Sequence, residues 1–131
     1  MKNTEKQYEK IVASILVHSK ESWAGNHAAA NRAFRSFTRA VCSQLAGGSS
    51  DILLRLAESE HPAVRHVGGY FLLPIDRKRA EKTLRALRRE RADGVGFNTR
   101  MLLEQWKKGT LKFPRMVSGR IVYLGADELI R

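Results

Sequence analysis

Apolar residues recur every three to four positions through most of this chain, and that spacing constrains its fold more than any other feature. The period matches the helical turn, so each stretch places its apolar residues on one face of a helix. The first stretch contains Tyr8, Ile11, Val12, Ile15 and Leu16. Glycine and proline residues interrupt the pattern where helices are expected to stop. The sequence therefore predicts an all-α fold of about six helices.

The expected helices follow one another with short connections. Asp51 and Asp76 stand where helices should start, and Pro62 suits the first turn of a helix. We expect helices from about Thr4 to Ser19, Asn26 to Leu45, Ile52 to Ser59, Pro62 to Pro74, Asp76 to Ala92, and Phe97 to Lys108.

The tail, residues 110–131, has a different pattern. Two runs, Lys112–Val117 and Arg120–Leu124, flank Ser118-Gly119, a pair that suits a two-residue hairpin turn. Because an isolated hairpin is marginally stable in water, we expect it to pack on the helices or on a partner. The chain thus divides into a helical repeat domain, residues 1–109, and a hairpin-like tail, residues 110–131.

The middle of the chain contains an internal echo. Leu53, Leu56, Val64 and Leu72 recur 31 residues later as Leu84, Leu87, Val95 and Leu103. Repeats of this length are typical of helical solenoids, in which paired helices bury their apolar faces by stacking on neighbouring pairs. The echo indicates an α-solenoid.

A family resemblance supports the same architecture. The segment Leu53–Arg65, with its His61-Pro62-Ala63-Val64-Arg65 turn, resembles the HEAT-repeat signature. The wider run from Asn31-Arg32 to the close Leu103-Glu104-Gln105-Trp106-Lys107-Lys108-Gly109 is similar to a small bacterial HEAT/armadillo-like family, a domain of unknown function numbered twenty-nineteen in that series. The resemblance covers roughly residues 5 to 110 and leaves the tail outside. It implies an α-solenoid scaffold without a known active site.

Charge is the second strong feature. The chain has 24 Lys and Arg residues against 13 Asp and Glu residues, a formal net charge of +11. That balance favours an anionic partner, which nucleic acid, an acidic protein or an anionic membrane surface would supply. The fifth predicted helix has the densest cluster, with Lys78, Lys82, Arg85 and Arg89 on one arc without a carboxylate. This basic ridge is either an anion-binding surface or a solvated face.

A weaker basic stripe lies on the second predicted helix. Arg32, Arg35 and Arg39 share a face opposite Phe34 and Phe37. Their stems could simply cover the helix surface, which is the alternative to partner binding. In a regular stack the second and fifth helices lie in opposite layers.

Two further residues are assigned to packing. Arg65 is expected to tie neighbouring repeats together through a carboxylate or backbone carbonyls, as the HEAT resemblance implies. Trp106 is expected to pack in the core, whereas Trp23, between the first two helices, stays ambiguous.

The sequence carries little that points to catalysis. Its four histidines, His18, His27, His61 and His66, show no helical metal-ligand spacing, and Cys42 is the only cysteine. Asp76 and Asp93 are better explained as a cap and a turn residue than as catalytic acids. We therefore expect no metal, no cofactor and no enzyme activity, with a HEAT-fold DNA glycosylase a distant third interpretation.

The prediction for function is a non-catalytic, macromolecule-binding scaffold with a basic face. An acidic protein is the favoured partner by analogy with other HEAT-like scaffolds, and an immunity or antitoxin-like role fits. The alternative is nucleic-acid binding through the basic ridge. The longest apolar stretch, Ile11–Val17, is too short to span a bilayer, so a cytoplasmic protein without membrane contact is expected.

Overall fold

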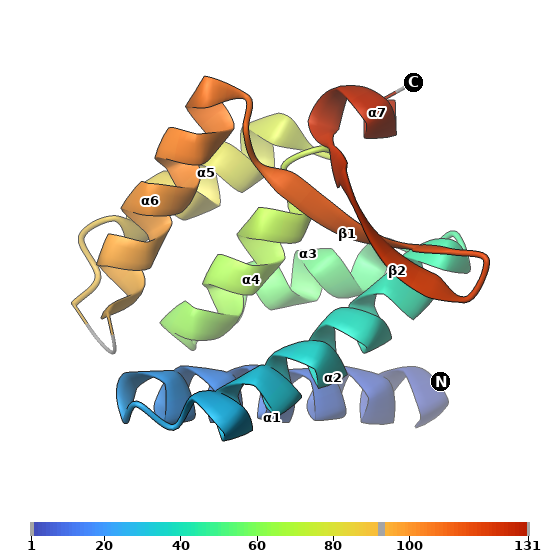
Figure 1. The fold of residues 1–131 in the computed structure, drawn as a ribbon, viewed down its shortest axis with the longest axis horizontal. Coiled ribbons are helices and arrows are strands. Elements are labelled where there is room, and N and C mark those ends of the chain that lie inside the picture. The colour runs from blue at the N-terminus through green and yellow to red at the C-terminus, as the bar shows by residue number, and fades with distance from the viewer. Residues whose placement is uncertain (1, 92–93, 131) are drawn as a thin grey trace.

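The computed structural model describes residues 2–91 and 94–130, which are mostly helical (Figure 1). The described elements are α1 (Lys2–Trp23), α2 (His27–Ala46), α3 (Asp51–Ala57), α4 (Pro62–Leu72), α5 (Arg77–Leu87), α6 (Val95–Lys108), β1 (Lys112–Val117), β2 (Arg120–Gly125) and α7 (Ala126–Ile130). The helical content and the two antiparallel strands confirm the predicted class and the hairpin.

The first two helices form a helical hairpin at one side of the molecule (Figure 1). α1 continues past the predicted end at Ser19 to Trp23, because the first helix-breaking residue is Gly25, with φ of +81°. α2 begins after Asn26, whose side-chain oxygen accepts a hydrogen bond from the Ala29 N–H at 3.3 Å.

α4 lies at the centre of the helices (Figure 1). It packs on α3 and α5 and also contacts α1 and α6. Two glycines permit this close approach: a Cβ on Gly68 would lie 2.4 Å from the Ala57 backbone nitrogen, and one on Gly69 would lie 2.7 Å from Leu84 Cδ2. A side chain at either position would therefore separate α4 from its neighbours.

The residues of the 31-residue echo belong to the core. Seven of them are at most 5% exposed, and Leu103 packs against them partly buried. Arg65 differs from its prediction, because its Nε is buried without a hydrogen-bond partner among the described residues. The acid nearest to it in sequence, Glu60, instead approaches His61 Nε2 at 3.8 Å.

α5 ends earlier than predicted, at Leu87 instead of near Ala92. After it the Glu90 N–H donates to the Leu87 carbonyl, and the Gly96 N–H donates to the Glu90 carbonyl, both at 2.9 Å. This turn brings the start of α6 so close that a Cβ on Gly96 would lie 2.2 Å from the Glu90 oxygen. Continuing the helix would remove that contact. Arg89 therefore lies in the turn. The predicted helix end at Ala92 and the predicted turn residue Asp93 fall outside the described residues.

The hairpin of β1 and β2 packs on α2 (Figure 1). Its turn residues Ser118 and Gly119 have φ of +51° and +78°, as a two-residue hairpin turn requires. Phe113 is fully buried and stacks on Tyr70 with ring centroids 5.1 Å apart. The Cys42 thiol donates to the Pro114 carbonyl at 3.3 Å. Hydrophobic packing thus holds the tail on the helices, and α7, which the sequence did not predict, follows it.

Candidate functional site

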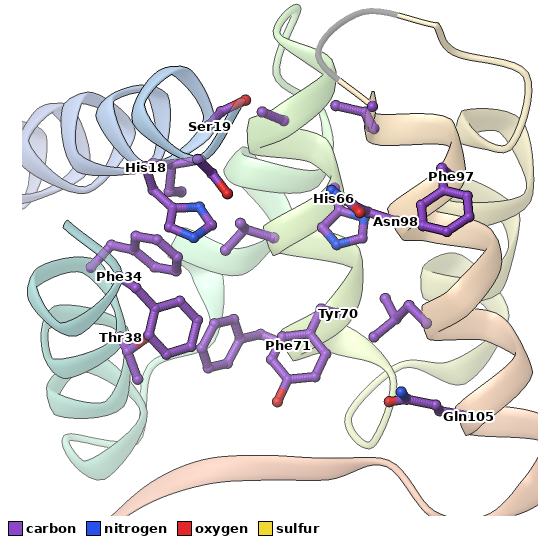
Figure 2. Close-up of a pocket in the computed structure, with 18 of the residues that line it drawn as sticks. His18, Ser19, Phe34, Thr38, His66, Tyr70, Phe71, Phe97, Asn98 and Gln105 are labelled. Carbon is purple, nitrogen blue, oxygen red and sulfur yellow. The ribbon is translucent and has the colours of Figure 1, made fainter. Parts of the chain in front are cut away.

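A hollow of about 840 Å³ lies between α1, α2, α4 and α6 (Figure 2). We call it the interhelical pocket. α1 and α2 form one wall, α6 forms the opposite wall, and α4 lies between them. The connection from α6 into β1, residues 110–112, completes the lining. No single helix contains this site, because each contributes only one face to it.

Aromatic and aliphatic side chains make up most of the lining. The deepest ones, Ile15, Phe37 and Phe71, are at most 3% exposed. Other aromatic rings lie toward the opening, where Trp23 is 69% exposed, Phe97 60% and Phe34 36%. Phe34 and Phe37 contact each other edge to face, at 5.3 Å between centroids. The pocket therefore offers both a buried apolar floor and exposed aromatic rings.

Two histidines from different helices line the pocket. His66 on α4 has its Nδ1 2.8 Å from the Thr99 Oγ1 of α6, and burial, with a smaller effect of His18, lowers its pKa to about 4. Burial also lowers the pKa of His18, whose ring lies 5.7 Å from the centroids of both Phe34 and Phe37. Both imidazoles are therefore neutral at pH 7.

Two hydroxyl groups at the pocket differ in their hydrogen bonding. Tyr70 donates to the Lys112 carbonyl, and burial raises the pKa of its phenol. Thr38 is 3% exposed, and its Oγ1 has no hydrogen-bond partner among the described residues. Because a buried hydroxyl without a partner costs free energy, Thr38 is an unsatisfied polar group at this site.

The only formally charged residue of the described lining is Lys112. Its Nζ lies beside Gly125 of β2, 3.6 Å from the place that a Cβ would occupy there. The lysine therefore lines the pocket while its ammonium group lies next to the second strand. The pocket surface is apolar with neutral polar groups.

The predicted basic ridge is only partly a single stripe. Lys78, Lys82 and Arg85 are exposed on α5, but Arg89 lies beyond the end of the helix. No carboxylate lies on this arc itself, but Glu81 lies beside it and its Oε1 is 3.6 Å from Arg85 Nη2. Glu81 further accepts a hydrogen bond from Trp106 Nε1 at 3.0 Å, and this contact is the main reason that its pKa is lowered. Of the four predicted ridge residues, only Lys78 and Lys82 lie on α5 without an ion pair to a described residue.

The arginines of α2 differ from Arg85 in their ion-pair contacts. Arg32, Arg35 and Arg39 are all exposed, and none of them forms an ion pair with a described residue. In the ribbon α3 and α4 stand between α2 and α5 (Figure 1). The two basic surfaces therefore remain separate.

The sequence analysis missed the interhelical pocket. Its polar groups come from four helices, and neither His18 nor His66 has a partner at helical spacing. The apolar periodicity indicated which helix faces are buried, and some of these faces form the pocket walls. That pattern does not distinguish a fully packed core from one that contains a pocket. Among the described residues no group of His, Cys, Asp and Glu could hold a metal ion. No helix in the described part of the chain is long and apolar enough to cross a membrane.

Comparisons with protein-family models, with curated proteins and with solved structures find no match to this chain. The candidate sites therefore stand on their own geometry.

Proposed function

We propose that this chain is a non-catalytic, macromolecule-binding protein whose favoured partner is an acidic protein. The observation that carries the proposal is the set of three exposed arginines on α2, which no described carboxylate neutralises. Guanidinium groups form paired hydrogen bonds with carboxylates, so a row of free ones suits an acidic protein surface. An immunity or antitoxin-like role, in which the chain masks such a surface, is consistent with this chemistry.

The scaffold belongs to the same proposal. We take the pairs α1–α2, α3–α4 and α5–α6 as HEAT-like hairpins of a short α-solenoid in a cytoplasmic protein of the domain-of-unknown-function family that the sequence resembles. Support comes from the central place of α4, which contacts α3, α5, α1 and α6, and from the burial of the echo residues. Stacked helix pairs leave extended surfaces for partners.

Nucleic-acid binding is the second candidate, and the charge of +11 favours it. Lys78 and Lys82 are exposed without an ion pair to a described residue, and the α2 arginines would also fit phosphates. Two observations weaken this alternative. Arg85 contacts Glu81, and Arg89 lies beyond the end of α5, so fewer unpaired basic side chains lie along the helix than the sequence predicted.

One charge-matched experiment separates the two candidates. The test variant carries Arg32→Gln, Arg35→Gln and Arg39→Gln. The control carries Lys6→Gln, Lys10→Gln and Lys20→Gln, which removes the same charge from exposed positions of α1. A protein partner recovered by pull-down after nuclease treatment should associate more slowly with the test variant than with the control.

Nucleic-acid binding predicts a different result. Wild-type affinity for duplex DNA should then fall steeply with salt, with a log–log slope of about −0.9 for each phosphate contacted. The test variant should flatten that slope by up to about three units, more than the control does. If both variants bind every ligand as the wild type does, the α2 arginines are a solvated face and the proposal fails.

A further inference from the structure

We infer that the interhelical pocket binds a compact, uncharged, ring-bearing small molecule with a polar group that hydrogen-bonds to the Thr38 hydroxyl. This site is distinct from the basic surfaces of the proposed function and does not depend on them.

The size of the pocket suits a small molecule. Its volume of about 840 Å³ lies within the range of about 300–1,000 Å³ that is usual for sites of small ligands. Such sites combine apolar and aromatic walls with a few placed polar groups, which is the composition found between Phe37, Phe71 and Thr38.

The shape of the pocket excludes a long helix or extended peptide as its occupant. α6 forms one wall along its 14 residues, which span about 20 Å. At the start of α6 the Trp23 ring covers Gly94, where a Cβ would lie 3.3 Å from the indole. Beyond its far end the chain crosses back as residues 110–112, which also line the pocket. The Trp23 ring and residues 110–112 thus narrow the hollow at the two ends of α6, which does not suit a long helix or an extended peptide.

The charge of the occupant follows from the lining. His18 and His66 are neutral at pH 7, and the Lys112 ammonium group lies beside Gly125. An ion would lose its hydration in this surrounding without meeting an opposite charge, which is unfavourable. The exposed rings of Trp23, Phe34 and Phe97 at the opening can instead stack on a flat, apolar ligand.

Thr38 is the reason that we expect a polar group on the ligand. Thr38 lines the pocket and is 3% exposed, and its Oγ1, which has almost no accessible surface, has no partner among the described residues. The Tyr70 hydroxyl, in contrast, already donates its hydrogen bond to the Lys112 carbonyl. A ligand hydroxyl or carbonyl that reaches this oxygen through a turn of the Thr38 side chain about χ1 would satisfy the group that folding leaves unpaired.

The test uses three probes of the same ring size: 2-naphthol, naphthalene and naphthalene-2-sulfonate. Titrations followed by amide NMR should show saturable 2-naphthol binding, with shifts concentrated in α1, α2, α4 and α6. Naphthalene should bind more weakly, and the sulfonate should bind weakest of the three. Thr38→Val keeps the shape of the side chain and removes the hydroxyl. It should weaken 2-naphthol by about three- to tenfold and leave naphthalene unchanged.

Two further variants locate the binding. Ala63→Trp places a large ring into the pocket wall and should abolish binding of all probes, with the helical spectrum intact. Ala28→Trp makes the same change at an exposed position outside the pocket and should bind as the wild type does. Thr38→Val keeps the test decisive if Ala63→Trp does not fold.

Several results would overturn the inference. These are an absence of saturable binding, equal affinity for the sulfonate, equal binding by the two tryptophan variants, or no selective loss in Thr38→Val. A dimer in sedimentation that Ala63→Trp dissociates would show that a second copy fills the pocket. A protein partner that Ala63→Trp alone releases would show that a partner side chain fills it.

Discussion

Acidification from pH 7 to pH 5 should destabilise this protein through His66. The imidazole is buried on α4 against Thr99, and burial lowers its pKa from 6.5 to about 4. Between these two values the unfolded chain binds a proton that the folded chain does not, so stability rises with pH. The contribution of His66 is therefore complete above about pH 6.5 and is lost as the pH falls toward 4.

The magnitude follows from the two pKa values. They give a loss of about 2 kcal/mol in the free energy of unfolding between pH 7 and pH 5, and about 3 kcal/mol in total below pH 4. His18, whose pKa burial also lowers, adds to the loss in the same direction. A loss of this size would be clearly measurable in a domain whose free energy of unfolding is about 5–15 kcal/mol.

Urea unfolding followed by circular dichroism at pH 7, 6 and 5 measures the effect. His66→Gln keeps a polar side chain near Thr99 but cannot titrate, so its stability should fall with pH by about 2 kcal/mol less than that of the wild type. His27→Gln, at an exposed position, is the matched control and should follow the wild-type curve. Equal pH dependence in His66→Gln and the wild type would refute the reasoning.

The remaining predictions concern the packing of α4 and its neighbours. Leu56→Ala and Leu87→Ala, at side chains no more than 2% exposed, should each cost about 2–5 kcal/mol in the free energy of unfolding. Losses under about 1 kcal/mol at both would contradict their place in the core. Gly68→Ala should cost about 1–3 kcal/mol, because its Cβ would lie 2.4 Å from the Ala57 backbone nitrogen. Gly47→Ala, whose Cβ would meet nothing nearer than 3.5 Å, should change stability by less than about 0.5 kcal/mol in the same denaturation assay.

Helix positions and the hairpin were predictable from sequence because their determinants are local. Asn26 and Asp76 cap α2 and α5 with their own side chains, and Gly109 ends α6 with φ of +76°. The Ser118-Gly119 turn likewise needs only two residues with positive φ. These signals lie within a few residues of the structure that they specify.

The end of α5 was not predictable in the same way. Its helical pattern continues through Arg88 and Arg89, yet Gly96 approaches the Glu90 carbonyl so closely that the chain must turn first. A contact between α5 and α6 therefore overrides a local preference. The contact between Arg85 and Glu81, in contrast, is an i,i+4 pair, which helical spacing makes available from the sequence.

The pocket could not be predicted from the sequence for a related reason. Its lining also differs in charge from the basic surfaces, so binding at the two places can be measured separately. His18, Thr38 and His66 come from three helices, so only tertiary packing brings them to one hollow. The chain has a net charge of +11, whereas Lys112 is the only formally charged residue of the described pocket lining and its ammonium group lies beside Gly125. Salt weakens phosphate or carboxylate contacts on the surface by screening and counterion release. It leaves the burial of an uncharged ligand largely unaffected, since that binding rests on apolar surface removed from water. The two kinds of binding should therefore respond to salt independently, even though both sites share α2.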